Sequence, residues 1–199
     1  FDLGERASLG IKRIAEDANP GTLSSEFASS GAGIVQGTII GPVPPFGDIG
    51  PGNTVSLTFA FDRKLARKVY FSYAAMIIPS NDAFIANEDR LAYPLFDKEG
   101  NFISADFIVP GSAVMDAGTE VNDEMPVNAA GVGLPEMFMP DTGVDEDAAI
   151  HQHPGYIRGG NILSNPMFAN ADFTTPGYQI ARIKIEAVSV PPQGCIYLS

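Results

Sequence analysis

Apolar and polar residues alternate most clearly in the segment NTVSLTFAFD, residues 53–62. Val55, Leu57 and Phe59 alternate with small or polar residues, so only one face of the segment is apolar. This period of two predicts a half-buried antiparallel strand. Other runs rich in β-branched and aromatic residues, bounded by Gly, Pro, Asn or Asp, predict strands at residues 33–42, 67–79, 102–109 and 178–190. A turn at residues 97–101 is expected just before the strand at residues 102–109.

A helical pattern precedes these strands. Apolar residues recur at helical spacing after Leu9, Ser8 is placed to cap the helix, and Pro20 follows its end. A second short helix or turn is expected over residues 22–30, and residues 122–175 are loop-rich with little periodicity. Seven or more strands with one helical excursion predict an all-β fold, an antiparallel β-sandwich with a short helix near the N-terminus and long loops.

The composition is typical of one folded domain. The chain has 199 residues, 45% of them hydrophobic, and its 21 Gly and 16 Pro are scattered as in a protein with many turns. Its net charge of −12 disfavours nucleic acid and anionic lipid surfaces as partners and favours cations. No run approaches the ~18 apolar residues of a membrane span, and the single Cys195 excludes an intrachain disulfide.

The segment MDAGTEVNDEMP, residues 115–126, concentrates negative charge. Asp116, Glu120, Asp123 and Glu124 lie within nine residues, with Asn122 among them. Such side chains are the oxygen ligands that Ca²⁺ prefers, and a turn through Ala-Gly would aim the first two acids at one point. Asp82, in a Pro-Ser-Asn-Asp turn, is another candidate ligand. The alternative is a solvated acidic loop with local side-chain to backbone hydrogen bonds.

Both histidines of the chain lie in the sequence HQHPG. On a strand, His151 and His153 would project to one face, as at the start of a transition-metal site, and acidic residues 145–147 lie just upstream. Two ligands are not a site, however, and hydrogen-bonded histidines that organise a loop are the alternative interpretation. The sequence contains no recognised hydrolase, phosphate-loop or zinc motif, so we do not expect an enzyme.

Five segments together resemble the spondin N-terminal domain family, the domain of F-spondin and mindin and of many bacterial exported proteins. The segments are FDLGERASLGIKRIAEDAN, FSYAAMIIPSNDAFIA, AVMDAGTEVNDE, IHQHPGYIRGG and YQIARIKIEAV, and the resemblance, to the bacterial-type branch, covers nearly the whole chain. It implies one domain over residues 1–199, an eight-stranded antiparallel sandwich that is a variant of the C2 domain. It also implies Ca²⁺ held by Asp82, Asp116 and Glu120. It assigns no role to Asn122, Asp123, Glu124, His151 or His153, which we expect to form an outer shell, a second site, or neither.

The resemblance predicts a secreted or cell-surface domain that acts in adhesion, extracellular matrix or surface assembly, with structural calcium. Family members usually carry a further strand ahead of the segment that matches residues 1–8. We therefore expect a protein partner, or self-association through a sheet edge, with the C-terminal segment 194–199 as a candidate added strand. The alternative function is a carrier of an apolar small molecule, held by a Phe- and Met-rich interior that includes residues 135–140.

Overall fold

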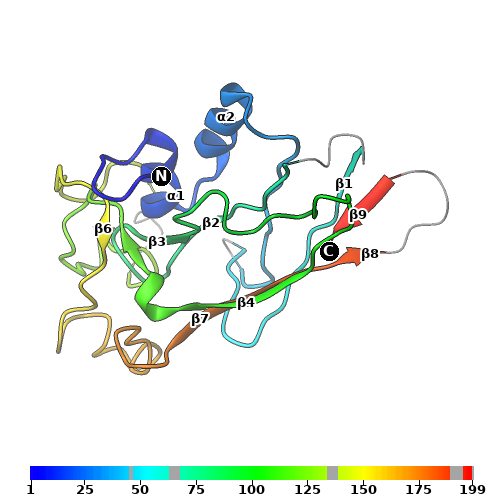
Figure 1. Ribbon diagram of the computed structural model, residues 1–199. Helices are drawn as coiled ribbons and strands as arrows, with labels where there is room; N and C mark the ends of the chain where they lie inside the picture. The colour runs from blue at the N-terminus through cyan, green and yellow to red at the C-terminus, as the bar shows by residue number, and fades with distance from the viewer. Residues whose placement is uncertain (45–46, 63–67, 134–138, 189–194, 199) are drawn as a thin grey trace.

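The computed structural model describes residues 1–199 except 45–46, 63–67, 134–138, 189–194 and 199 (Figure 1). The described part contains two α-helices, α1 (Leu9–Asp17) and α2 (Gly21–Ser30), and the 3-10 turn η2 (Gly111–Ala113). Its strands are β1 (Phe59–Asp62), β2 (Ala74–Met76), β3 (Ala83–Ala86), β4 (Ala105–Pro110), β5 (Met115–Asp116), β6 (His151–Gln152), β7 (Gln179–Ile185), β8 (Ala187–Val188) and β9 (Cys195–Leu198). The prediction of a mostly-β fold with short helices near the N-terminus is confirmed.

The strands form three antiparallel sheets. Their orders are β2-β3-β5-β6, β4-β7 and β1-β9-β8. The four-stranded sheet lies below α1, the long β4-β7 pair runs beneath that sheet, and the β1-β9-β8 sheet lies at the far end of the molecule from β6 (Figure 1). The C-terminal strand β9 is therefore the central strand of a sheet within its own chain.

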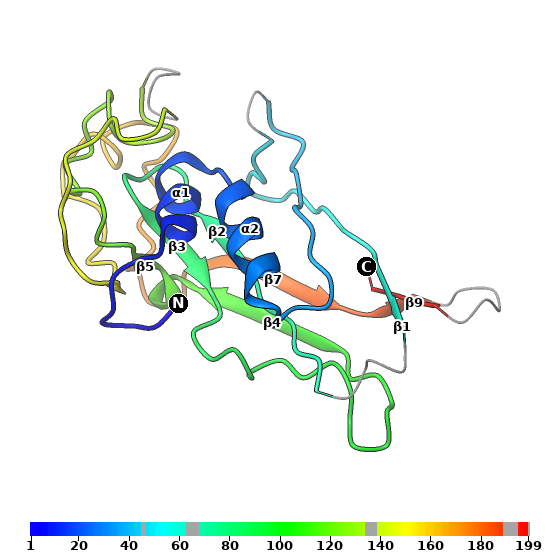
Figure 2. The same ribbon diagram turned by 90° about the horizontal axis from the view of Figure 1, so that it is seen from above.

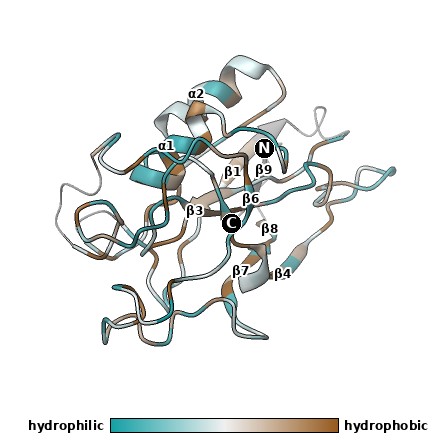
Figure 3. Ribbon diagram, turned by 90° about the vertical axis from the view of Figure 1, so that its left-hand side faces the viewer, coloured by the Kyte–Doolittle hydropathy of each residue, from teal (hydrophilic) through white to brown (hydrophobic). Residues whose placement is uncertain are grey.

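The first helix forms where the sequence predicts it, because its signals are local. The Ser8 hydroxyl accepts a hydrogen bond from the backbone N–H of Ile11 at 3.2 Å, which caps the helix. Ala18 adopts a left-handed conformation and ends the helix two residues before Pro20. Ile11 and Ala15 are buried on one face, and Figure 3 shows apolar and polar residues on the same short helix. The second helix is confirmed as well.

Strand β3 is buried on both sides and carries the core of the molecule. Phe84 points toward α1 and packs in one apolar cluster with Ile11. Ala83 and Ile85 point the opposite way and pack with Val109 of β4 in another, as the alternation of side chains along a strand requires. The four-stranded sheet therefore lies between the helices and the β4-β7 pair (Figure 2).

The strands are shorter than the sequence predicts. No residue of the described segment 33–42 joins a strand, and only residues 59–62 of the segment 53–62 do so. A Cβ on Gly37 would meet the Leu57 side chain at 2.5 Å, so these two segments touch, but their described residues form no ladder with each other. The predicted turn at residues 97–101 is confirmed by a hydrogen bond from Asp97 N to Asn101 O at 3.0 Å. Most of the segment 135–140, proposed as part of an apolar pocket, lies outside the described residues.

Candidate metal centre

Two of the predicted ligands meet because β3 and β5 are antiparallel neighbours. Ala83 of β3 pairs with Asp116 at the end of β5, and Asp82 immediately precedes β3. The two acids therefore lie at the same end of the sheet. Both side chains are completely buried, with 0% of their surface exposed, an environment that ionised carboxylates occupy only when they are compensated.

A third carboxylate, that of Glu146, reaches the same point from a distant loop. The backbone of residues 118–121 pairs with that of residues 144–148, through bonds from Val121 N to Val144 O and from Ala148 N to Gly118 O, each 2.8 Å long. Carboxylate oxygens of Asp82, Asp116 and Glu146 consequently lie within 4.8 Å of one another. Two oxygens bound to one Ca²⁺ ion are separated by at most about 5 Å, twice the metal–oxygen distance. The group therefore has the spacing of a cation site.

The two oxygens of Asp82 have different surroundings. Its Oδ2 accepts three hydrogen bonds, from Thr119 N at 2.8 Å, Thr119 Oγ1 at 3.1 Å and Glu120 N at 3.0 Å. Its Oδ1 is the one buried side-chain nitrogen or oxygen in the described part of the chain that has no hydrogen-bond partner. Burial, and then the charge of Asp116, raises the pKa of Asp82 to about 7. A cation at Oδ1 would supply the missing partner and compensate the charge.

Asp116 is held in place by its own loop. Its Oδ1 accepts a hydrogen bond from Gly118 N at 2.7 Å, and its Oδ2 accepts one from the Asn122 side chain. Gly118 has φ +66°, and a Cβ at this position would meet the backbone of Ala148 at 2.8 Å. A glycine is therefore required both for the turn and for the close approach of the loop that carries Glu146.

Glu120 lies beside this group rather than in it. The turn at Gly118 sends the Glu120 side chain toward Asn81, whose Nδ2 lies 3.4 Å from the Glu120 carboxylate. The side chain is 5% exposed, and burial raises the pKa of Glu120 to about 8, with Glu16 and Asp82 adding to the shift. The structure thus brings Asp82 and Asp116 together as predicted and adds Glu146, which the sequence shows only as part of an acidic run.

The outer residues of the acidic segment stabilise loops. Asp123 accepts hydrogen bonds from Met125 N at 2.9 Å and from the Asn128 side chain at 2.8 Å. The buried carboxylate of Glu124 accepts two backbone N–H groups of the loop 157–162, at 2.6 and 3.1 Å. Asp123 therefore makes the local hydrogen bonds that the alternative interpretation expected, whereas Glu124 is buried and binds a distant loop.

Asn122 connects the centre to the histidines. It donates to Asp116 Oδ2, and its Oδ1 lies 3.1 Å from His153 Nε2. His153 Nδ1 accepts a hydrogen bond from Gly155 N at 3.0 Å, so both ring nitrogens have partners, and burial lowers the pKa of His153 to about 4. His151 is exposed, with Nε2 3.7 Å from Asp116 Oδ2. The two rings thus do not converge on one ligand position.

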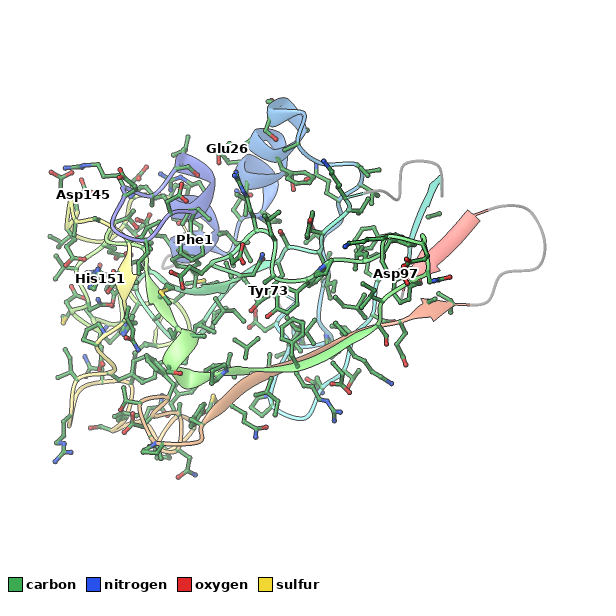
Figure 4. The ribbon with its side chains drawn as sticks, in the orientation of Figure 1. Phe1, Glu26, Tyr73, Asp97, Asp145 and His151 are labelled. Carbon is green, nitrogen blue, oxygen red and sulfur yellow. The ribbon has the colours of Figure 1, made fainter. Side chains whose placement is uncertain are left out.

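The loop that carries Glu146 is also held by ion pairs from the N-terminal part of the chain. Arg6 pairs with Asp147, and in α1 Arg13 and Lys12 pair with Asp141 at 2.6 and 3.5 Å. Lys12 also lies 3.7 Å from Asp145. Figure 4 shows Asp145 and His151 at one end of the molecule, next to α1. Three of the 12 basic residues in this chain pair with this one loop, and two of them, Lys12 and Arg13, also pair with Glu16 and Asp17 inside α1.

Neither helix found in the described residues has the length and apolar character needed to cross a membrane. Comparisons of the chain with protein-family models, with curated proteins and with solved structures found no match. The candidate centre therefore rests on its geometry, and the resemblance to the spondin N-terminal domain stays a prediction.

Proposed function

We propose that this chain is a calcium-binding β-rich domain in which the ion is structural. The observation that carries the proposal is the buried Asp82 Oδ1, which has no hydrogen-bond donor and belongs to a group of three carboxylates. Three mutually repelling charges at a sheet end destabilise the folded state unless a cation lies among them. Bound Ca²⁺ would connect β3, β5 and the loop 144–148.

The chemistry of the donors favours calcium over a transition metal. All three carboxylates offer oxygen, which suits hard cations, and Ca²⁺ accepts the irregular geometry that loops provide. His153 has both ring nitrogens engaged, so it contributes no nitrogen ligand. His151 has Nδ1 hydrogen-bonded to Ala149 O at 3.0 Å and Nε2 3.7 Å from Asp116 Oδ2, and a preference for Zn²⁺ over Ca²⁺ would give this Nε2 a role as a ligand.

The biological role that we propose follows from the spondin resemblance. It is that of an exported domain that acts in adhesion, extracellular matrix or surface assembly, with the C2-type sandwich as its fold. Asp82 and Asp116 would be two of its calcium ligands, and Glu120 or Glu146 the third acid. Self-association through a sheet edge, or a protein partner bound there, would assemble it.

Thermal unfolding tests the metal site. Excess Ca²⁺ should raise the melting temperature relative to protein in EGTA, because a ligand of the folded state stabilises it by about 2.7 kcal/mol at a hundred times its Kd. Asp116→Asn should abolish this response. Asp106→Asn is the matched control, since Asp106 is exposed on β4 and its ion pair with Arg182 contributes little to the stability of the fold. An equal response in both variants would place the ion elsewhere.

Light scattering tests the assembly role separately. Self-association predicts a mass above that of the monomer at micromolar concentration in Ca²⁺. If the protein is a monomer in Ca²⁺ and its melting temperature still rises with Ca²⁺, self-association is refuted and the metal site is supported.

A further inference from the structure

A cleft of about 310 Å³ opens beside the end of β4, and Met115, the chain neighbour of Asp116, is among the residues that line it. The cleft lies between residues 87–89, 92 and 93 of the segment that follows β3 and the end of β4 with η2. Arg90, in the same segment, is exposed and is not among the residues that line the cleft. Tyr73, which precedes β2, lies between the four-stranded sheet and β4 (Figure 4). The volume is at the small end of the range for sites that take small molecules, about 300–1,000 Å³.

Aromatic rings form one wall of the cleft. Tyr93 and Phe107 are stacked, with ring centroids 4.1 Å apart and planes within 9° of each other. Tyr73 packs against Phe107 at 6.2 Å. Burial, and then the neighbouring Tyr93, raises the pKa of Tyr73 to about 12, so its hydroxyl stays neutral at physiological pH. The wall is thus aromatic, with one face of Tyr93 and one face of Phe107 covered by the other ring.

The charged residues of the cleft are all acidic. Glu88 and Asp89 are exposed at its rim, and none of the described residues that line it is Lys, Arg or His. Asn87 braces this rim, because its Oδ1 accepts a hydrogen bond from Tyr73 N at 2.9 Å and its Nδ2 donates to Asp89 O at 3.0 Å. The carboxylates are therefore presented on a braced turn beside the aromatic wall.

We propose that this cleft binds a small organic cation, an ammonium group carried on an aromatic or apolar body. The acids attract the ammonium group, the rings stabilise it through cation–π contact, and the apolar body packs against Phe107 and the exposed Ile108. An anion of the same shape is repelled by the two carboxylates and by the net charge of −12. The site differs from the purely apolar carrier pocket that the sequence suggested, because charge selects its ligand.

Three probes of similar shape test the charge dependence. Protein saturated with Ca²⁺, so that the carboxylate group near Asp116 is occupied, is titrated with 2-phenylethylammonium, 2-phenylethanol or 3-phenylpropionate and followed by amide NMR. The proposal expects saturable shifts for the ammonium probe at residues 87–93 and 107–113, and weaker affinity as salt is raised. Shifts of equal size for the neutral alcohol, or none for the amine up to 10 mM, would overturn it.

A charge-neutral variant tests the rim. Glu88→Gln should weaken binding of the ammonium probe about two- to fivefold, the value of one exposed charge pair. Glu99→Gln removes the same charge from the exposed turn at residues 97–101 and should leave the affinity unchanged. Both positions are exposed, so both variants should melt like the original protein. Equal weakening in both would mean that net charge alone attracts the probe, which contradicts a defined site.

Discussion

Replacing Asp82 by Asn should stabilise the calcium-free protein while abolishing its response to calcium. In the native structure Oδ2 of Asp82 accepts three hydrogen bonds, whereas Oδ1 accepts none. An asparagine keeps the acceptor at the first position through its carbonyl oxygen. At the second position it places an N–H donor that faces the carboxylates of Asp116 and Glu146. The substitution thus removes one buried charge and replaces an acceptor that has no donor by a donor in a group of carboxylates.

The size of the effect follows from the cost of an unsatisfied buried polar group, about 1–3 kcal/mol. For a chain of about 200 residues each kcal/mol shifts the melting temperature by about 2–4 °C. Asp82→Asn in EGTA should therefore melt between about 2 and 12 °C higher than the original protein. In excess Ca²⁺ the order should reverse once the ion stabilises the native chain by more than this amount.

Asp116→Asn provides the contrast. Both oxygens of Asp116 already accept hydrogen bonds, from Gly118 N and from the Asn122 side chain. An amide N–H at either position faces a donor, so this variant should gain less stability in EGTA than Asp82→Asn, although it also loses the calcium response. Differential scanning calorimetry with and without Ca²⁺ measures both. An Asp82→Asn protein that melts lower in EGTA and still responds to Ca²⁺ would refute the reasoning.

Other perturbations separate the roles of neighbouring groups. Glu146→Gln should weaken Ca²⁺ binding about tenfold or more in calorimetric titrations, whereas a larger loss in Glu120→Gln would make Glu120 the third ligand. Gly118→Ala should cost about 1–3 kcal/mol in denaturant unfolding because of its φ of +66°, and should weaken Ca²⁺ binding by displacing the loop at Ala148. Burial raises the pKa of Asp82 to about 7 and that of Glu120 to about 8, so between about pH 8 and pH 6.5 the folded apo protein binds protons that the unfolded chain does not. The melting temperature of the apo protein in EGTA should therefore rise as the pH falls through this window, and its affinity for Ca²⁺ should fall. Burial lowers the pKa of His153 to about 4, so His153 opposes the rise in melting temperature only below about pH 6.5.

Local signals in the sequence predicted local structure. The N-cap at Ser8 and the spacing of apolar residues placed α1 correctly, because a helix forms its hydrogen bonds within one segment. A strand needs a neighbour with which to form a ladder, and the run at residues 33–42 forms none with the residues that the structure describes. The same limit explains the short β1, which is paired over residues 59–62 although the burial alternation extends back to Val55.

The candidate centre was predictable only in part. The resemblance pointed to Asp82 and Asp116, and the β3-β5 register brings them together. Glu146 joins them through backbone pairing between residues 118–121 and 144–148, which no spacing rule shows. Glu120, four residues after Asp116, was expected to aim at the same point, but the turn at Gly118 sends it toward Asn81. Sequence separation is a poor guide to convergence inside a tight turn.

The ion pairs between α1 and the loop of residues 141–147 link the first helix to the proposed ion site. Lys12 and Arg13 hold Asp141, and the same loop supplies Glu146. A bound ion that orders this loop should therefore also stabilise α1, which is paired with the loop. Amide hydrogen exchange in residues 12–17 should slow when Ca²⁺ is added and quicken when it is withdrawn. The N-terminal helix would then report the occupancy of a centre whose ligands lie 65 or more residues further along the chain.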